Sequence, residues 1–383
     1  MRLRPVEDQV VVVMGASSGI GRETAIEFAS RGAKVVVSAR GEEGLDSLAE
    51  AIRGFGEVTV IPGDVTDPEQ MRDVAEKAVE RYGRLDTWVH LAAVSLYARF
   101  EATRPSEFEQ VVRTNLLGQA NGALAALPHL RRNGRGAFIS VSSIEAVRAL
   151  PYQSAYAAAK HGVDGMIEAL RVELKRERVP VQITEILPSS IDTPLFEHAR
   201  TRIGVRPKGM PPVYDARLVA RAIVWAAEHP TRRLVVGGGG RLLAALEGIV
   251  PGVVDGFLTM AGFRGQRTRV PKSSGAADNL SRPIDAGHSV AAGPESRGRR
   301  WSLYSTWTLS PWSRPATAAL VLGVGLLAAR AVSNRRRENS GRQWRLGRAR
   351  GGYEYVNPYL YEEPEERSGR LEPATGRRTS LRE

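Results

Sequence analysis

The sequence predicts an α/β fold built on a doubly wound parallel sheet of about seven strands. Short runs of β-branched residues alternate with longer stretches of helical spacing throughout residues 1–240. The runs are almost wholly apolar, which is typical of parallel strands that helices cover on both faces. The expected strands lie at 10–14, 34–39, 58–61, 85–91, 137–141, 181–187 and 234–236, and the expected helices at 22–31, 68–82, 107–130, 153–175 and 215–228.

The first expected strand runs into a glycine-rich turn, VVVVMGASSGIG, which a helix follows. Gly15 permits the tight turn, Gly19 lets the backbone approach a phosphate, and Gly21 lets the helix pack closely on the strand. The start of the helix adds free N–H groups and the positive end of a dipole. The turn therefore predicts a dinucleotide site, although its spacing differs from the commoner G-x-G-x-x-G. The residues expected to contact the cofactor here are Gly15, Ser17, Ser18, Gly19, Ile20 and Gly21.

The end of the second expected strand distinguishes between two dinucleotides. An acidic residue near this point commonly binds the ribose 2′-hydroxyl of NAD, whereas an arginine accommodates the 2′-phosphate of NADP. The stretch between Lys34 and Gly41 holds no carboxylate, and Arg40 supplies a planar guanidinium that suits a phosphate. The sequence therefore predicts NADP as the cofactor and makes NAD the less favoured one. The alternative is that Arg40 is an ordinary solvated side chain.

Acid–base chemistry is predicted at Tyr156 and Lys160, which lie four residues apart on an expected helix and so share one face. A free phenol has a pKa near 10, and a nearby ammonium favours its ionised form. A phenol tuned in this way can exchange a proton with an alcohol or carbonyl oxygen at neutral pH. Ser143 follows the fifth expected strand, at the sheet edge where α/β folds bind ligands. These three residues together predict a catalytic site.

Residues 8–240 resemble the short-chain dehydrogenase/reductase family through most of their length. The resemblance implies a Rossmann fold and an enzyme that transfers hydride between NADP(H) and a carbonyl or secondary alcohol. The features that carry it occur in the family's order and spacing; they are the glycine turn, Asp64-Val65, Asn115, Ser143, Tyr156-x-x-x-Lys160 and 188–193.

The resemblance also implies a role for each matched residue. Tyr156 is expected to be the acid/base, and Lys160 to lower its pKa and to hold the nicotinamide ribose. Ser143 is expected to hydrogen-bond the reacting oxygen, and Asn115 to position a water that relays protons to Lys160. The expected cofactor contacts beyond the glycine turn and Arg40 are Asp64 and Val65 at the adenine, Pro188, and Ile191 and Thr193 at the carboxamide.

Three positions depart from the family's pattern. Met14 stands where the family usually has Thr, the segment from His90 to Ala93 replaces Asn-Asn-Ala-Gly, and Ser189 replaces Gly. We expect His90 to be a packed, neutral histidine rather than a catalytic residue or a metal ligand. No metal site is predicted. The departures leave the four expected catalytic residues intact, so they bear on cofactor affinity more than on activity.

A loop at 194–214 is expected to cover the nicotinamide and to shape the substrate site. It offers the apolar residues Leu195, Phe196, Ile203 and Met210, which favour an apolar or bulky substrate. The alternative is an ordinary surface loop. A second alternative concerns the whole protein, which could bind NADP as a regulatory or scaffold protein without turnover. The intact set of Asn115, Ser143, Tyr156 and Lys160 favours the enzyme.

The net charge of +12 is unevenly distributed along the 383 residues. Residues 1–240 carry 31 basic and 29 acidic residues, whereas 241–383 carry 23 and 13. The excess therefore belongs to the C-terminal part, and no nucleic-acid partner is expected. The chain has no cysteine, which excludes disulfides and thiolate metal sites and suits a reducing compartment. We expect a small-molecule substrate and a homo-oligomer.

The composition divides the chain after the catalytic domain at 1–240. An apolar extension at 241–263 is expected to pack on the domain or on a partner subunit. Residues 264–314, rich in Gly, Ser, Pro and Ala, are expected to be a linker, and 334–383 a disordered charged tail.

Residues 315–333 form a hydrophobic segment whose environment the sequence leaves open. Its uncharged run at 315–329 spans about 22 Å as a helix, against a hydrocarbon core of roughly 30 Å. One interpretation is a membrane-inserted or re-entrant helix, assisted by the basic residues that follow it. The other is a helix buried in an oligomer. The start of the chain has no apolar segment like that of a signal peptide, so we expect a cytoplasmic catalytic domain, with or without membrane attachment.

Overall fold

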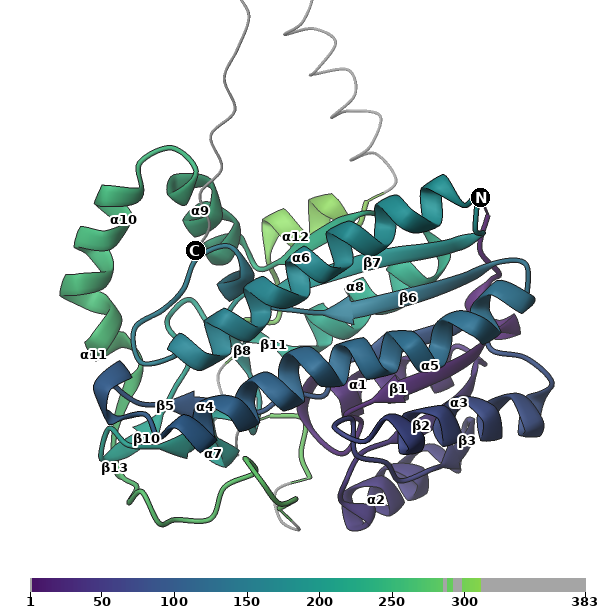
Figure 1. The fold of residues 1–383 in the computed structure, drawn as a ribbon, viewed down its shortest axis with the longest axis horizontal. Coiled ribbons are helices and arrows are strands. Elements are labelled where there is room, and N and C mark those ends of the chain that lie inside the picture. The colour runs from purple at the N-terminus through teal and green to yellow at the C-terminus, as the bar shows by residue number, and fades with distance from the viewer. Residues whose placement is uncertain (1, 285–287, 292–297, 311–383) are drawn as a thin grey trace, which may run out of the picture. The chain divides into compact units, whose positions relative to one another are not determined.

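A parallel sheet of seven strands forms the centre of the fold in the computed structural model, which describes residues 2–284, 288–291 and 298–310 (Figure 1). The strands follow the order β12-β7-β6-β4-β1-β2-β3, and every neighbouring pair is parallel. They comprise β1 Val10–Met14, β2 Lys34–Ser38, β3 Glu57–Val60, β4 Thr87–His90, β6 Gly136–Val141, β7 Val181–Pro188 and β12 Arg233–Val236. The predicted fold class is confirmed.

The strand order reverses direction between β1 and β4. From β1 the chain moves outward through β2 to β3, then returns to pair β4 with the other edge of β1. The chain continues outward on that side through β6, β7 and β12. In an open α/β sheet such a reversal opens a crevice beyond the carboxyl ends of the strands.

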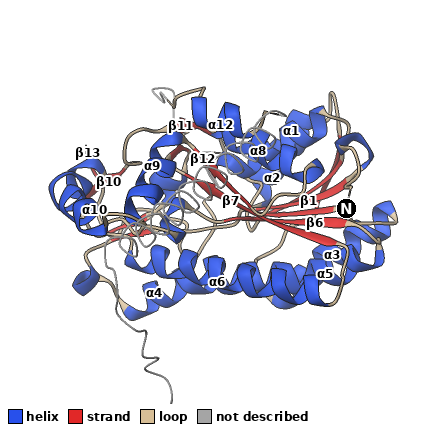
Figure 2. Cartoon of the chain, turned by 90° about the horizontal axis from the view of Figure 1, so that it is seen from above, coloured by secondary structure: helices blue, strands red, loops and turns tan. Residues whose placement is uncertain are grey.

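Two layers of helices cover the sheet, one on each face (Figure 2). One layer contains α1 Gly19–Ser30, α2 Glu42–Ile52 and α8 Ala216–Glu228. The other contains α3 Pro68–Tyr82, α5 Gly118–Arg132 and α6 Ser154–Arg176, with α4 Pro105–Val112 beside α6. The sequence analysis did not identify α2, although Leu45, Leu48 and Ile52 provide the helical spacing that buries one of its faces.

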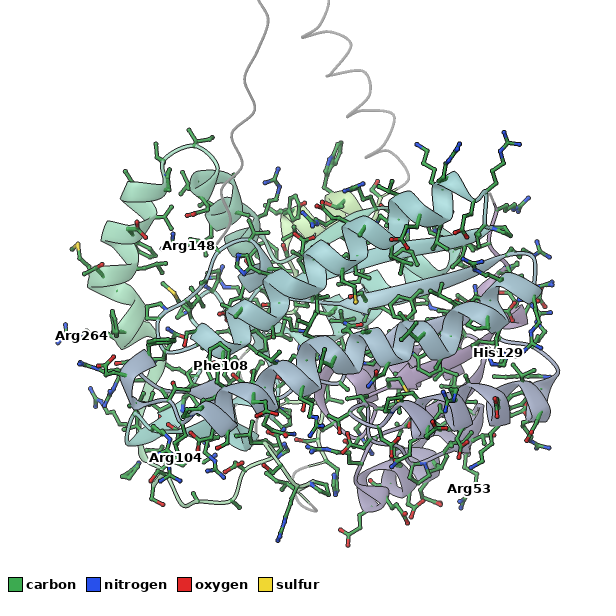
Figure 3. The ribbon with its side chains drawn as sticks, in the orientation of Figure 1. Arg53, Arg104, Phe108, His129, Arg148 and Arg264 are labelled. Atoms are coloured by element: carbon green, nitrogen blue, oxygen red, sulfur yellow. The ribbon has the colours of Figure 1, made fainter. Side chains whose placement is uncertain are left out.

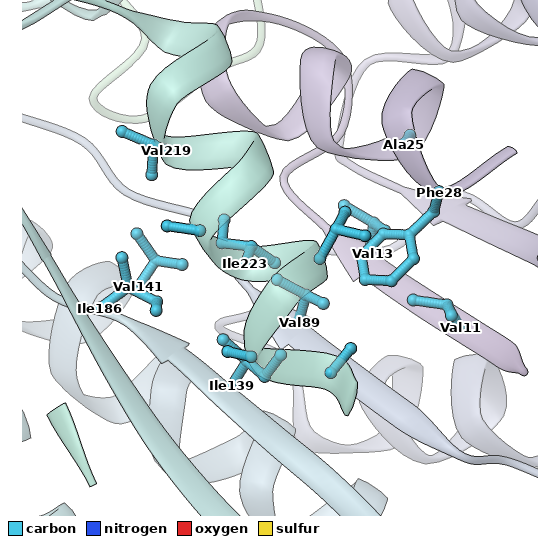
Figure 4. Close-up of a cluster of buried hydrophobic side chains, with 14 of the residues drawn as sticks. Val11, Val13, Ala25, Phe28, Val89, Ile139, Val141, Ile186, Val219 and Ile223 are labelled. Atoms are coloured by element: carbon cyan, nitrogen blue, oxygen red, sulfur yellow. The ribbon is translucent and has the colours of Figure 1, made fainter. Parts of the chain in front are cut away.

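Alternate side chains of β1 belong to the two different cores. Val11 and Val13 pack with Phe28 of α1, whereas Val12 and Met14 face the opposite layer. Figure 4 shows the first of these cores, where Val11 and Val13 lie near Phe28 and Ile223 stands among side chains of the central strands. Because side chains alternate along a strand, a strand covered on both faces must be apolar at every position. This requirement explains why all five residues of β1 are apolar.

Sequence signals at both ends define α3. Asp67 caps the helix by accepting hydrogen bonds from Glu69 N and Gln70 N, and Pro68 occupies its first turn, where a missing N–H costs nothing. Gly83 ends the helix with a φ of 75°, a conformation that glycine adopts without strain. The helix therefore has the bounds that the sequence predicts.

The helix predicted at 107–130 is interrupted in the structure. It consists of α4, a π-helical segment at Arg113–Leu117 and α5. Single π-helical turns occur often at functional sites, and this one contains Asn115. The 3.6-residue spacing of apolar residues continues across the segment, so the sequence pattern contained no sign of the wider turn.

The described part of the predicted linker at 264–314 packs on the domain. Residues 267–271 form a strand that pairs antiparallel with 205–207, and Arg200 Nε donates to Asp278 Oδ2 over 2.6 Å. Ser305 Oγ accepts a hydrogen bond from Gly237 N over 3.0 Å. These contacts are made by backbone groups and ion pairs, which leave little trace in hydrophobic spacing. The described residues of this stretch are thus part of the fold.

The predicted apolar extension at 241–263 packs only partly on the domain. Val254 and Leu258 are buried, whereas Ile249, Val253 and Met260 are exposed. Among the described residues, no helix combines the length and the hydropathy needed to cross a bilayer. The expected hydrophobic helix at 315–333 and charged tail at 334–383 lie outside the described residues.

The remaining elements are short. The short strands are β5 Leu96–Tyr97, β8 Ile191–Asp192, β9 Arg200–Thr201, β10 Val205–Pro207, β11 Tyr214–Asp215 and β13 Arg267–Pro271. The remaining α-helices are α7 Leu195–His198, α9 Gly238–Glu247, α10 Pro251–Phe257, α11 Phe263–Gly265 and α12 Leu303–Thr308. A second π-helical segment spans Leu258–Gly262, and 3₁₀ turns span Val6–Asp8, Phe100–Ala102 and Ile144–Ala146.

We predict that Gly21→Ala destabilises the fold. A Cβ at residue 21 would lie 2.1 Å from Gly15 O, so backbone must shift, which typically costs about 1–3 kcal/mol of unfolding free energy. Gly54→Ala is the matched control, because a Cβ there meets no atom of the structure within 4 Å. Urea denaturation followed by circular dichroism measures both variants. Equal stability of the two variants would contradict the close packing described here.

Candidate active site

A cavity opens where the strand order reverses, beyond the carboxyl ends of β1, β4, β6 and β7. All six residues predicted in the glycine turn line it. Gly15 has a φ of +82°, and a Cβ on it would lie 2.7 Å from Ala92 N. Gly19 has a φ of +57° and begins α1, so the first N–H groups of the helix face this side. The turn can therefore hold an anionic group.

Arg40 follows β2 and lines the same cavity. Its Nη2 donates a hydrogen bond to Asn279 O over 2.6 Å, and Gly19 N donates to Ser289 O over 2.9 Å. Two of the predicted cofactor donors thus bond backbone carbonyls of the C-terminal segment. Burial lowers the pKa of Arg40 and the nearby charge of Asp64 raises it.

The two residues predicted at the adenine lie in different surroundings. Val65 lines the cavity. Asp64 accepts hydrogen bonds from Thr66 N and Thr66 Oγ1 through its Oδ1, each over 2.9 Å. The carboxylate of Asp64 therefore orders the turn after β3 and acts on Arg40 through its charge.

Three predicted cofactor residues on the far side of the crevice, Pro188, Ile191 and Thr193, also line the cavity. A Cβ on Gly19 would lie 3.3 Å from the Cβ of Thr193, so Thr193 stands close to the start of α1. Ser189, which replaces the family's glycine, donates to Gly237 O and accepts from Gly240 N, over 3.0 and 3.1 Å. These bonds account for a hydroxyl at that position.

Ser143, Tyr156 and Lys160 converge on the cavity from two elements. Ser143 follows β6, and its Oγ accepts a hydrogen bond from Glu145 N over 3.1 Å. Tyr156 lies in the first turn of α6, and Lys160 lies one turn later. Lys160 Nζ is 5.6 Å from the centre of the Tyr156 ring and donates to Val141 O over 3.0 Å. The phenol, the hydroxyl and the ammonium thus meet in one cavity.

Burial controls the acid–base properties of this group. It raises the pKa of Tyr156 above its ordinary value, and the charge of Glu145 raises it further, while a hydrogen bond with Ser143 opposes both effects. Burial also lowers the pKa of Lys160 to about 8, against the opposing charges of Glu185 and Glu145. The net shift of the pKa of Tyr156 in the protein alone is upward, because burial of the phenol outweighs the effects that lower it. The expected effect of Lys160 on this pKa stays a prediction.

Asn115 holds the π-helical segment in place. Its Oδ1 accepts from Val94 N and its Nδ2 donates to Val94 O, both over 2.9 Å. The side chain is fully buried, and these two bonds use both ends of the amide. Asn115 thus ties the helix beside α6 to the stretch after β4, next to the cavity. Its expected role with a water molecule stays a prediction.

His90 is buried at the end of β4. Trp88 Nε1 donates to His90 Nδ1 over 3.5 Å, and burial together with the charge of Lys160 lowers the pKa of His90 to about 3. The imidazole is therefore neutral at physiological pH, as expected. Met14, the other departure in the centre of the sheet, is fully buried in the core between the sheet and α3, α5 and α6.

The substrate side of the cavity differs in part from the prediction. Leu195, Phe196 and Met210 line the cavity, whereas Ile203 packs in a cluster with Tyr97 and Ala199. The polar residues Glu145, Gln153 and Gln266 also line it and were not predicted. The positions of Glu145 and Gln153 close to Ser143 and Tyr156 in the sequence could have indicated them. Gln266 lies in the predicted linker, where no signal pointed to it.

Comparison with known proteins agrees with this geometry. The family model for short chain dehydrogenases matches residues 9–204. An uncharacterized oxidoreductase of Bacillus subtilis, YxnA, is 35% identical over 335 residues, which cover 86% of this chain and 91% of that protein. The 3-oxoacyl-[acyl-carrier-protein] reductase FabG of Thermotoga maritima is 33% identical over 193 residues, 50% of this chain and 78% of that protein.

Solved structures give the same result. Levodione reductase superposes with a TM-score of 0.54 at 27% identity, covering 62% of this chain and 99% of that chain. An alcohol dehydrogenase from Thermococcus sibiricus complexed with 5-hydroxy-NADP superposes with a TM-score of 0.53 at 24% identity, covering 60% of this chain and 95% of that chain, which shows a shared fold. The chain therefore belongs to the short-chain dehydrogenase family and is an oxidoreductase that acts on CH–OH groups.

Proposed function

We propose that the protein transfers hydride between NADP(H) and a carbonyl compound or secondary alcohol, with Tyr156 as the acid/base. One observation carries this proposal: Ser143, Tyr156 and Lys160 line the same cavity as the glycine turn. A bound nicotinamide dinucleotide supplies the hydride or accepts it. A protein that only bound the dinucleotide would need no phenol and hydroxyl directed at a reacting oxygen.

The residues of the cavity suit this cofactor. The N–H groups of Gly19 and Ile20, at the start of α1, would hold the pyrophosphate, and Arg40 would hold the 2′-phosphate. Ile191 and Thr193 would contact the carboxamide. Gly19 N and Arg40 would exchange carbonyl acceptors of the C-terminal segment for phosphate oxygens. For Gly19 N the exchange replaces a bond between neutral groups by a charge-assisted one, which is roughly twice as strong, and for Arg40 it pairs the guanidinium with an opposite charge, so the exchange favours the cofactor.

The protonation of Tyr156 favours the direction of reduction. Its raised pKa keeps the phenol protonated at neutral pH, ready to give a proton to the oxygen of a carbonyl substrate. Ser143 Oγ accepts from Glu145 N and also hydrogen-bonds the phenol in the protein alone, so a bound substrate oxygen would take the place of the phenol oxygen as the acceptor of its hydrogen. Lys160 stands near the ring with a positive charge that stabilises the phenolate left behind. In the direction of oxidation the same phenolate must form before substrate loses its proton.

Apolar side chains bear on two further properties, the chemical class of the substrate and the packing of subunits. Val94, Leu150, Phe196 and Met210 line the cavity, which supports a substrate with an apolar part. Exposed apolar side chains on the extension, including Val253, Phe257 and Met260, support packing against a second subunit.

We further propose that the catalytic domain is cytoplasmic and attached to a membrane through 315–333, a proposal that rests on the sequence alone. Cell fractionation of the full chain and of a chain ending at Ser310 tests it. We expect the full chain in the membrane fraction at low and at high salt, and the shortened chain in the soluble fraction. Full solubility of both chains would refute membrane attachment.

Replacing the phenol should abolish turnover without loss of the cofactor. In Tyr156→Phe the proton donor is lost, and general acid catalysis typically contributes about a hundredfold to ten-thousandfold in rate. We expect kcat to fall by that factor while the Kd for NADPH stays within about twofold. Tyr82→Phe, on α3 away from the cavity, is the control. Nicotinamide absorbance with a panel of ketones measures turnover, and substantial activity of Tyr156→Phe would refute the role of the phenol.

Arg40 should determine the preference for NADPH over NADH. A hydrogen-bonded charge pair is worth about 1.5–3 kcal/mol, so Arg40→Ala should weaken NADPH binding by roughly tenfold to a hundredfold and leave NADH binding nearly unchanged. Arg53→Ala is the control, since Arg53 is exposed at the end of α2 (Figure 3). Titration calorimetry gives the six dissociation constants of the wild type and the two variants for NADPH and NADH. If the wild-type protein bound both cofactors equally, the assignment would be wrong.

A further inference from the structure

A buried carboxyl group stands beside the acid–base residues and takes no part in their proposed chemistry. Glu145 lies two residues after Ser143, in the 3₁₀ turn Ile144–Ala146, and its exposed fraction is 5%. It lines the cavity together with Ser143 and Tyr156. A buried carboxyl group destabilises a fold unless it is neutral or well hydrogen-bonded, so its presence at this point calls for a physical explanation.

Glutamine side chains from two distant parts of the chain orient Glu145. Gln153 Nε2 donates to Glu145 Oε1 over 2.9 Å and to Gln266 Oε1 over 3.0 Å. Gln266 Nε2 donates to Pro151 O and Gly262 O, each over 3.0 Å. All three side chains are buried. Both amide donor groups are thus engaged, which fixes the direction in which the carboxyl group points.

One oxygen of Glu145 keeps spare hydrogen-bonding capacity. Within the described residues, the hydrogen bond that Oε2 accepts comes from Leu150 N over 3.4 Å, which is long for an N–H···O bond. Burial raises the pKa of Glu145 to about 8, so the group is mostly protonated at neutral pH. A protonated carboxyl group can both donate and accept a hydrogen bond.

Apolar side chains also line the cavity that Glu145 faces. Val94, Leu150, Phe196 and Met210 form other parts of the cavity lining. A bound substrate that is apolar throughout would displace water and leave Glu145 Oε2 without a partner, whereas a substrate oxygen would satisfy it. A site with buried polar groups rejects an analogue that lacks the matching group far more strongly than an apolar pocket rejects an extra group.

We propose that Glu145, oriented by Gln153 and Gln266, is a substrate subsite that selects carbonyl or alcohol substrates carrying a second oxygen function, a hydroxyl or keto group, beside an apolar part. This inference rests on the proposed function and narrows its substrate class. Glu145 acts here as a specificity residue and Gln153 and Gln266 as positioning residues.

Ionisation of Glu145 gives the subsite a pH dependence. The titratable groups that face it are Tyr156 and Lys160 on α6 and Tyr97 on β5. Arg148, on the same turn as Glu145, is held by Glu247 and Asp255 over 3.0 and 2.5 Å (Figure 3). Above pH 8 the carboxyl group loses its proton and can no longer donate. The preference for a second keto oxygen should therefore weaken as pH rises through 8, whereas the preference for a hydroxyl should strengthen, because the hydroxyl donates to the carboxylate in a charge-assisted bond.

The test uses 2-nonanone and its 1-hydroxy, 3-hydroxy and 4-hydroxy derivatives, each reduced by the full-length enzyme with NADPH. We expect kcat/KM for at least one hydroxyketone to exceed that for 2-nonanone by about tenfold or more at pH 7, and by a larger factor at pH 9, where the hydroxyl donates to the ionised carboxylate. The ratio of the two constants is the readout, since it cancels effects on the shared chemical step. A ratio near one for all three derivatives would overturn the proposal.

Two variants assign the preference to Glu145. Glu145→Leu should bring the ratio to within about threefold of one. Glu145→Gln keeps a hydrogen-bonding group of the same shape, so it should retain a preference that no longer changes between pH 7 and pH 9. Glu109→Gln, an exposed carboxyl on α4, is the control and should behave as the wild-type protein does. A wild-type ratio and pH profile in both Glu145 variants would overturn the proposal.

The same measurements distinguish failure of the inference about Glu145 from failure of the proposed function. Circular dichroism and NADPH binding establish that each variant is folded, and the pH profile of Glu145→Gln decides the matter if Glu145→Leu does not fold. If the folded wild-type protein binds NADPH but reduces none of the ketones, the proposed function fails. If it reduces 2-nonanone as well as its hydroxylated derivatives, only the inference about Glu145 fails.

Discussion

The site depends on a close approach of backbone to backbone at the first turn of the fold. A Cβ on Gly15 would stand 2.7 Å from Ala92 N, and a Cβ on Gly21 would stand 2.1 Å from Gly15 O. Glycine at both positions lets β1, the stretch after β4 and the start of α1 come into contact. The first N–H groups of α1 then face the crevice where the strand order reverses, beside the carboxyl ends of β6 and β7. The cofactor side and the substrate side can share one cavity for this reason.

Within that cavity, burial outweighs charge. The phenol of Tyr156 stands near an ammonium group, yet removal from water dominates and holds its proton in place. The same effect lowers the pKa of Lys160 and raises that of Glu145 and Glu185, so three ionisable groups are shifted toward their neutral forms. Small changes of charge in this enclosed site, such as those a cofactor ring or a substrate brings, have large effects on proton transfer because little water screens them.

The chain beyond the family's shared segment completes the site. The short-chain dehydrogenase model ends at residue 204, whereas Gln266 and Asn279 lie in the C-terminal segment and line the same cavity. This segment is held by the ion pair of Asp278 with Arg200, whose guanidinium also donates to the buried Glu107 over 3.0 Å. Loss of one partner from a buried, hydrogen-bonded ion pair strongly destabilises a fold. Part of the cavity lining therefore lies outside the segment that the family model matches.

The sequence by itself determined the sheet, most of its helices and the positions at which the residues expected to be catalytic lie along them. Apolar β-branched runs, a capped helix such as α3 and the glycine turn are local signals, and local backbone preferences and burial act on them directly. The spacing of Tyr156 and Lys160 likewise follows from helix geometry alone. These features could be predicted because each depends on neighbours in the sequence.

Tertiary structure decided what depends on contacts between distant residues. The direction of the pKa shift at Tyr156 follows from burial by the surrounding elements, the π-helical turn at Asn115 from two bonds to Val94, and the subsite at Glu145 from Gln266, more than a hundred residues away. The described part of 264–314 joined the fold through backbone pairing and ion pairs that composition does not reveal. Desolvation and long-range hydrogen bonds are properties of the packed chain, so no pattern of neighbouring residues contains them.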